Sequence, residues 1–176
     1  MEFLHKVHDA KLGPKGLRPI HRAAAAGCLP LVKHLGGSNT GLAWESSDHG
    51  LSCLECAACG NTDDHADVVA YLLQTRRGRS SHMRHTASLT SRRSTPLHHA
   101  ASGGHPRIVT ALSLYAEWWN KRDAQGLTPF AVACAHGHLE CVKLMAANEN
   151  CLPDNPAPAL NGDTPLMQVR AAVCCT

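Results

Sequence analysis

The strongest constraint in this sequence is a short pattern that returns at a fixed interval. Thr95 and Pro96 begin a stretch that starts again, with the same two residue types, at Thr128 and Pro129. The two prolines are 33 positions apart, an interval that fits one pair of helices with its turn. A chain made of such units buries its apolar surface by packing each unit against its neighbours in sequence.

Each part of the stretch 94–126 predicts a local structure. Thr95 is a good N-cap, and Pro96 suits the first helical turn, where its missing N–H would have no partner. The glycines at 103 and 104 end this helix, because glycine tolerates the left-handed conformation that follows a helix C-terminus. Pro106 begins a second helix, whose apolar residues recur at helical spacing: Ile108, Val109, Leu112 and Tyr115. The unit is therefore a helix, a tight turn, a second helix and a hairpin-like loop.

Further copies of the unit run through most of the chain. The position of Pro96 is taken in these copies by Pro19, Cys53, Pro129 and Pro165. With its Thr-Pro-Leu-His start, paired alanines and Gly-His step, the unit resembles the ankyrin repeat. The resemblance implies an all-α fold, an ankyrin-repeat solenoid of stacked helix–turn–helix units with hairpin-like loops. We call the first helix of each pair the inner helix and the second the outer helix.

Composition agrees with stacked thin helices. The chain is 44% hydrophobic but only 4% aromatic, so its core must be built from Ala, Leu, Val and Cys. Its 176 residues fit a single ankyrin-repeat domain, 1–176. We expect a half repeat with an outer helix at 1–16, repeat one at 17–50, repeat two at 51–93, repeat three at 94–126, repeat four at 127–162 and a truncated repeat five that caps the stack at 163–176. The alternative is that the chain is a fragment of a longer array.

A basic loop at 74–93 lengthens repeat two. It holds six arginines and no acidic residue, a composition typical of a solvated segment. Two functional interpretations remain beside that one. Ser80 and Ser81 follow arginines as in sites of basophilic kinases, where a phosphate would reverse the local charge. Alternatively, the loop attracts an acidic protein surface or RNA, although the absence of aromatic residues makes nucleic acid the weaker expectation.

Repeat two also contains a metal-like spacing of cysteines. Cys53, Cys56 and Cys59 recur every three residues, with His65 nearby, and thiolates at such spacing can hold zinc or iron. The repeat register instead places Cys53 at the proline position and Cys56 on the packed face of the inner helix. We therefore expect these two thiols to be small core residues and expect no bound metal or other cofactor.

The register also assigns the tryptophans and histidines. Trp119 falls at a semi-buried position and Trp118 at an exposed one, where it could anchor a partner. Ala116 stands where glycine usually follows the outer helix, so this helix is expected to run on or to turn with strain. Histidines at the Thr-Pro-Leu-His position or at the start of an outer helix are expected to form hydrogen bonds within the scaffold. These are His21, His98, His105 and His138. His136 instead falls at an outward, variable position of an inner helix.

No catalytic constellation is visible, so we expect no enzyme activity. The ankyrin resemblance implies protein recognition by the loop tips and by a concave face of inner helices. The candidate contacts are Trp44, His49, Arg92, Arg93, Trp118, Lys121, Arg122, Gln125 and His136. We therefore expect a monomeric scaffold or adaptor that binds a partner protein with an acidic surface and does not bind a membrane. The nine cysteines and the lack of an export signal favour the cytoplasm or the nucleus. Two alternatives are a metal- or redox-responsive protein and the regulatory ankyrin part of a larger one.

Overall fold

The structure is a computed structural model that describes residues 17–36, 47, 51–76 and 94–151. Every regular element in these ranges is helical. The chain divides into two compact units, residues 1–91 (unit 1) and residues 92–176 (unit 2). The predictions for 1–16 and 163–176, and most of that for the basic loop at 74–93, lie outside the described residues. The start of this loop was placed too early, because 74–76 belong to a helix that ends at Arg76.

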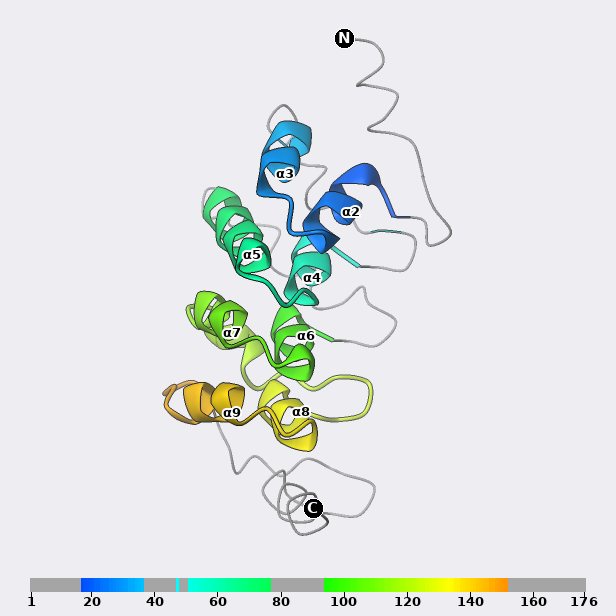
Figure 1. The fold of residues 1–176 in the computed structure, drawn as a ribbon. Helices are drawn as coiled ribbons and strands as arrows, with labels where there is room; N and C mark the ends of the chain where they lie inside the picture. Colours follow the sequence, from blue (N-terminus) through cyan, green and yellow to red (C-terminus); the bar gives the residue numbers. More distant parts are fainter. Residues whose placement is uncertain (1–16, 37–46, 48–50, 77–93, 152–176) are drawn as a thin grey trace. The chain divides into compact units, whose positions relative to one another are not determined.

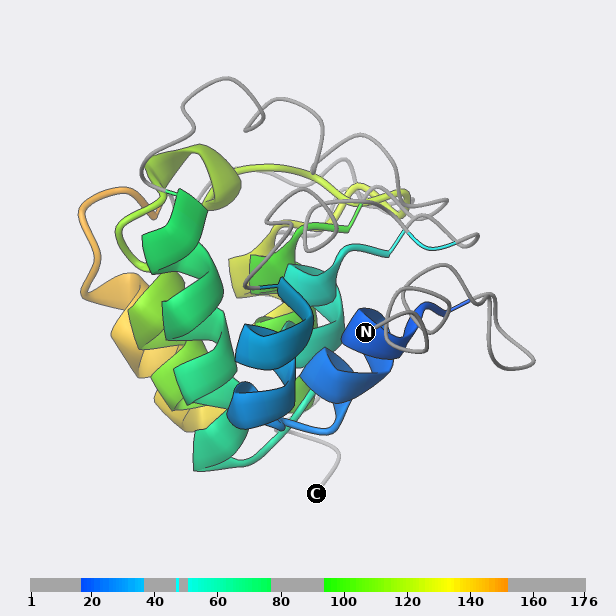
Figure 2. The same ribbon diagram turned by 90° about the horizontal axis from the view of Figure 1, so that it is seen from above.

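Unit 1 contains two helix pairs. The first pair is α2 (Pro19–Ala25) with α3 (Leu29–Gly36), and the second is α4 (Cys53–Ala58) with α5 (Asp63–Arg76). The inner helices α2 and α4 pack against each other, as do the outer helices α3 and α5. Both views of this unit show the same layering (Figure 1) (Figure 2).

Unit 2 repeats this arrangement with α6 (Pro96–Gly103), α7 (Pro106–Leu112), α8 (Pro129–Ala135) and α9 (Leu139–Ala146). A short 3-10 helix, η2 (Ala116–Trp118), follows α7. The inner helices α6 and α8 lie side by side, and α7 packs against α9. The four complete helix pairs predicted from the sequence are therefore present, two in each unit.

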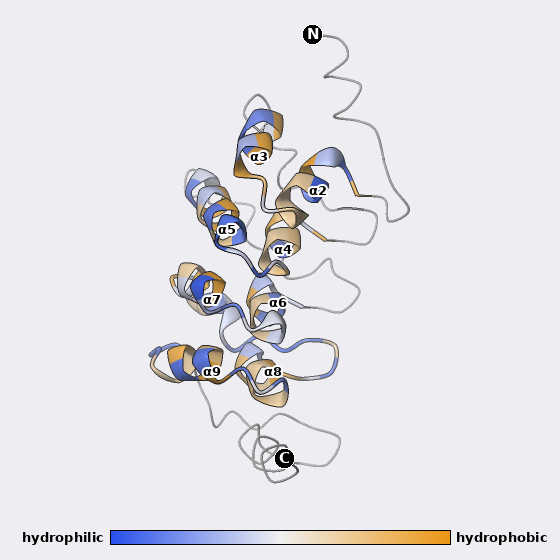
Figure 3. Ribbon diagram, viewed as in Figure 1, coloured by the Kyte–Doolittle hydropathy of each residue, from blue (hydrophilic) through white to orange (hydrophobic). Residues whose placement is uncertain are grey.

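Small side chains allow the inner helices to approach closely. Ala100 and Ala101 of α6 are fully buried, and Ala57 and Ala58 of α4 are buried to the same extent. The inner helices α4 and α8 are hydrophobic over most of their surface, whereas the outer helices α5 and α9 carry hydrophilic residues on one side (Figure 3). This pattern follows from position, because an inner helix has protein on several sides and an outer helix has solvent on one.

A histidine in each unit links one repeat to the preceding one. His65 Nε2 lies 3.0 Å from the Ala25 carbonyl oxygen in unit 1, and His138 Nε2 lies 3.0 Å from the Ser102 carbonyl oxygen in unit 2. Gly104 has a φ of +68°, and a Cβ built on it would lie 2.5 Å from His138 Nδ1. Glycine is therefore required there both for the backbone turn and for the histidine ring.

The outer helix of repeat three ends earlier than the sequence predicted. α7 stops at Leu112, and the chain turns through η2 instead of continuing past Ala116. Tyr115 consequently lies outside the helix, stacked on Trp118 with ring centroids 4.8 Å apart. The sequence predicted that this helix would either continue past Ala116 or turn there with strain. In the structure the helix has already ended, and a 3-10 turn begins at Ala116.

Candidate functional site

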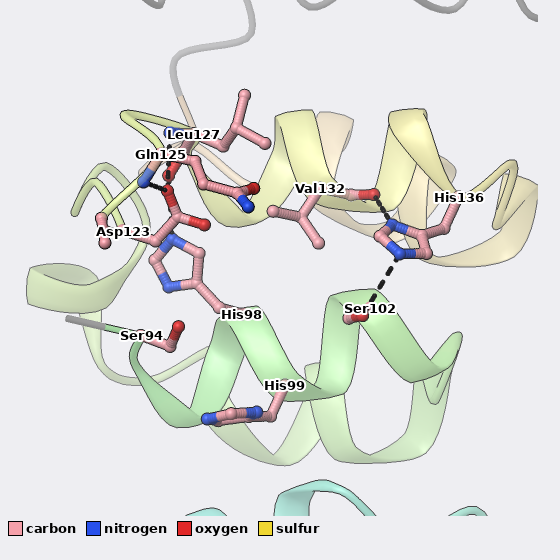
Figure 4. Close-up of a pocket in the computed structure, with 10 residues that line it drawn as sticks. Ser94, His98, His99, Ser102, Asp123, Gln125, Leu127, Val132 and His136 are labelled. Carbon is pink, nitrogen blue, oxygen red and sulfur yellow. Dashed lines mark hydrogen bonds between the residues drawn. The ribbon is translucent and has the colours of Figure 1, made fainter. Parts of the chain in front are cut away.

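The described part of unit 2 contains a groove between α6, α8 and the loop at 119–128. Its volume is about 460 Å³. The side chains around it come from both inner helices and from the loop (Figure 4). The lining residues are Ser94, His98, His99, Ser102, Asp123, Ala124, Gln125, Leu127, Val132 and His136.

His98 fixes one end of this groove by bonding in two directions. Its Nε2 lies 3.0 Å from the Leu127 carbonyl oxygen, which can only accept, so Nε2 carries the proton. Its Nδ1 then accepts hydrogen bonds from the Thr95 backbone N–H at 3.1 Å and the Thr95 hydroxyl at 2.8 Å. Burial lowers the pKa of His98 below its ordinary value of 6.5. The neutral imidazole thus ties the start of α6 to the loop that precedes α8.

The loop itself is closed by Asp123. Its Oδ1 accepts from the backbone N–H of Gln125 at 2.8 Å and from that of Leu127 at 2.9 Å. The Arg122 guanidinium donates to the Gly126 carbonyl oxygen at 2.9 Å. These bonds leave the Gln125 side chain exposed at the loop tip, facing the groove. A short loop with this many internal bonds presents its tip in a defined position.

The other end of the groove holds His136. Its Nδ1 donates to the Val132 carbonyl oxygen at 2.9 Å, so in the neutral ring Nε2 is the acceptor. The Ser102 hydroxyl lies 3.5 Å from that nitrogen, at the limit of a hydrogen bond. His138 stacks behind, with its ring centroid 6.0 Å from that of His136. The His136 Nε2 and the Ser102 hydroxyl at this end could therefore form hydrogen bonds to a ligand in place of their weak mutual contact (Figure 4).

Comparison with known families identifies the scaffold. A family model described as ankyrin repeats (3 copies) matches residues 20–119, 81–155 and 97–172, which together extend over most of the chain. The chain belongs to the ankyrin-repeat family. Among curated proteins, no match to the sequence is found. Ankyrin repeats are generally protein–protein interaction modules and are typically not enzymes.

The structure places some of the candidate contacts at exposed positions. Gln125 and His136 are exposed, and the structure brings both to the same groove. Lys121 is exposed on the same loop but does not line the groove, and Arg122 is half-buried with its guanidinium engaged by the backbone. The remaining candidates lie outside the described residues: Trp44, His49, Ser80, Ser81, Arg92 and Arg93.

The predicted exposure of Trp118 is wrong. Trp118 and Trp119 each have about 1% of their surface exposed. The 3-10 turn at 116–118 directs the Trp118 ring inward onto Tyr115, and the Trp119 indole N–H donates to the Ser113 carbonyl oxygen at 3.3 Å. Trp118 is therefore buried and is not a surface anchor.

Most of the residues that line the groove were not among the contacts predicted from the sequence, and three polar ones come from α6 or the residues before it. Ser94 precedes the α6 cap, and His99 and Ser102 lie on α6 at a spacing of three. That spacing puts the last two on one face of the helix, next to the corresponding outward face of α8. The repeat interval of 33 relates His99 on α6 to Val132 on α8, which also lines the groove, so this recurrence was the available signal for His99.

The cysteine cluster of repeat two is a packing feature. Cys53 and Cys56 are buried, as the register predicted, and Cys59 is exposed. Burial raises the pKa of the Cys56 thiol to about 12 and that of Cys53 further, so both hold their protons. His65 uses its ring nitrogens on Thr62 and Ala25. No group of three or more metal-ligating side chains is placed to hold an ion in the part of the chain that the structure describes.

The described helices are also too short or too polar to cross a membrane. No helix within these residues combines the required length with sufficient hydropathy.

Proposed function

We propose that this ankyrin-repeat chain is a non-enzymatic scaffold or adaptor that binds a partner protein through the groove of unit 2. The observation that carries the proposal is the groove of about 460 Å³ between α6, α8 and the loop tip. Gln125 and His136 line it from opposite ends and are exposed. Their contacts to the scaffold leave polar atoms available, which suits recognition of a peptide segment or loop.

A rigid surface lowers the entropic cost of binding. The groove meets this condition because His98 joins α6 to the loop and Asp123 closes the loop on itself. The polar ends would set the register of a bound segment, while Val132 and Leu127 supply apolar contact between them. The groove is therefore the best candidate surface among the described residues.

The partner is proposed to present an acidic surface. Lys121 is exposed beside the groove, and the chain carries a formal net charge of +3. Arg92 and Arg93 precede repeat three directly in the sequence and would extend the positive charge. Lys121→Ala, and the double substitution of Arg92 and Arg93, should slow association more than they speed dissociation. Raising the salt concentration should remove most of this effect, because the screening length is about 8 Å at physiological ionic strength.

Site-specific photocrosslinking tests the surface directly. A photoreactive amino acid at position 125 or 136 should crosslink a partner, which mass spectrometry then identifies. The matched control is position 110, because Thr110 is exposed on α7 and does not line the groove. Crosslinks from position 110 alone would show that the outer helices, and not the groove, contact the partner.

The wider assignment is proposed on the same basis. We propose a single ankyrin-repeat domain, acting as a monomer in the cytoplasm or nucleus. The seven cysteines in the described ranges are free thiols, which suits a reducing compartment. Size-exclusion chromatography with light scattering, and microscopy of a tagged chain, would test these two points.

A further inference from the structure

Glu55 is a buried carboxyl group that forms no ion pair within the part of the chain that the structure describes. It belongs to α4, and only 1% of its surface is exposed. Its Oε2 accepts from the Ser52 backbone N–H at 2.8 Å and from the Ser52 hydroxyl at 2.9 Å. Its Oε1 has no hydrogen-bond partner among the described residues. One oxygen is therefore used in capping the helix, and the other is enclosed without a donor.

The elements packed around α4 do not supply a cation to this carboxyl group. α4 packs on α2 and α5. The titratable or charged groups of these elements and of the residue before α2 are Arg18, His21, Arg22, Asp63, Asp64, His65, Asp67, Tyr71 and Arg76, together with the thiols of α4 itself. Glu55 forms no ion pair with any of them in the described ranges. Among the described residues, Ser52 is therefore the only group that donates hydrogen bonds to this carboxyl group, and none forms an ion pair with it.

We infer that Glu55 makes the α4/α5 pair a proton-sensitive element, which opens more readily as the pH rises through the neutral range. The carboxyl group is neutral in the closed form, and the loss of its proton leaves an enclosed charge that solvent would relieve. Opening of α4 exposes Cys53 and Cys56, which are buried on the same short helix. The accessibility of these two thiols to a labelling reagent therefore reports whether α4 is closed or open.

The direction of the effect follows from proton binding. Burial raises the pKa of Glu55 from 4.5 to about 7, against the opposing hydrogen bonds from Ser52. The closed form therefore binds more protons than the open form between these two values. Rising pH favours the form that has lost the proton, so the closed form is favoured most below pH 4.5 and this advantage is gone above about pH 7.

Thiol labelling of the full chain tests the inference. 4,4′-Dithiodipyridine is applied at pH values from 5 to 8, and mass spectrometry measures the labelling rate of each cysteine. Each rate is divided by that of the same cysteine in the urea-unfolded chain at the same pH, which removes the intrinsic pH dependence of the thiol. The corrected rates at Cys53 and Cys56 should rise roughly tenfold to a hundredfold over this range. Cys141, buried in α9 of unit 2, is the internal reference and should not follow them.

Substitutions at position 55 separate this mechanism from others. Glu55→Gln has no ionisable group, so the corrected rates at Cys53 and Cys56 should become nearly independent of pH. Glu55→His places a titrating base there instead, and its corrected rates should be flat or fall as the pH rises. The matched control Glu117→Gln removes an exposed carboxylate and should keep the wild-type profile.

Three results would overturn the inference. The first is a wild-type profile that stays flat from pH 5 to 8. The second is a Glu55→Gln profile that rises as steeply as that of the wild type. The third is a parallel rise at Cys141, which would show general loosening and not a switch in α4. Should Glu55→Gln fail to fold, the wild-type and Glu55→His profiles still decide the question, because a Glu55→His profile that rises as steeply as that of the wild type would contradict the inference.

Discussion

Glu55 in α4 and His98 in α6 occupy the same position in two ankyrin repeats. Each is the third residue of its inner helix, and each completes a capping box with the residue before the helix, Ser52 or Thr95. Both side chains are buried. The local bonding at the helix start is therefore equivalent in the two units, although one side chain is an acid and the other a base.

The difference lies in what each side chain can do with its second polar atom. The imidazole of His98 accepts from Thr95 with one nitrogen and donates to the Leu127 carbonyl oxygen with the other. The second oxygen of Glu55, Oε1, has no hydrogen-bond partner among the described residues, so this carboxyl group makes no corresponding bond to a following loop. His98 joins its helix to the following loop, while the Glu55 carboxyl group accepts hydrogen bonds only from Ser52, at the start of its own helix, among the described residues. This position thus joins α6 to the next loop in unit 2, whereas in unit 1 it holds a buried carboxyl group with one unpartnered oxygen.

The largest effect should come from removing the imidazole. His98→Ala leaves the Leu127 carbonyl and the Thr95 N–H buried without partners, and unfolding of unit 2 should become easier by about 2–4 kcal/mol. Hydrogen exchange of peptides from 94–151, followed by mass spectrometry, measures the change. Glu55→Ala should destabilise unit 1 less at pH 8, because the charged carboxylate already opposes folding there. Equal losses of stability on His98→Ala and Glu55→Ala would contradict this comparison. His136→Ala, at an exposed site, is the control and should change stability little.

Overpacking should be the next largest effect and should be alike in both units. Ala58→Leu in α4 and Ala101→Leu in α6 each force a larger side chain into a site with no exposed surface. Each should cost about 1–3 kcal/mol, measured by urea unfolding. Ala135→Leu, at an exposed position of α8, should change stability little. An unchanged unfolding curve for Ala101→Leu would mean that the inner helices do not approach closely at that residue.

The two units should also respond to pH in opposite directions. Burial lowers the pKa of His98, so folded unit 2 binds fewer protons at this site than the unfolded chain. Its stability should be full above about pH 6.5, the ordinary value for imidazole, and should be lost as the pH falls below it. Hydrogen exchange of 94–151 between pH 5 and 7.5, corrected for the intrinsic exchange rate, should show this slope. His98→Gln should remove most of it, and a slope that persists in that variant would assign it to another group.

The smallest effect on stability is expected at the loop tip. Gln125→Ala should lie within about 0.5 kcal/mol of the wild type, since the side chain is exposed. The same substitution should weaken partner binding, measured by surface plasmon resonance once a partner is identified. A large loss of stability would mean that Gln125 supports the scaffold and is not free for recognition.

Sequence reasoning succeeded where local chemistry repeats. The caps at Thr95 and Thr128, the proline starts and the left-handed Gly104 appear as predicted, because each follows from one or two residues. The buried alanines and the inward thiols of Cys53 and Cys56 follow equally from the repeat register. The exposed ends of the groove, Gln125 and His136, were found by position alone.

The failures arose where the backbone departs from the repeat. Assigning Trp118 to the surface assumed a constant turn after the outer helix, but the 3-10 turn at 116–118 rotates its ring into the core. The spacing of three between Tyr115 and Trp118 was the available signal, since it allows the rings to stack. The free Oε1 of Glu55 could not be predicted, because it depends on which donors the surrounding helices present.

The histidine links between repeats limit how this protein could be rearranged by engineering. His65 and His138 each need the backbone carbonyl of an inner helix in the repeat before them, at Ala25 and Ser102. Repeat one carries Cys28 at the equivalent place, after Gly27. A designer who exchanged repeats one and four would thus break one link and create none. The repeats of this chain are therefore not interchangeable. Any consensus or shuffled library should keep each linking histidine in the repeat that directly follows the inner helix whose carbonyl it contacts.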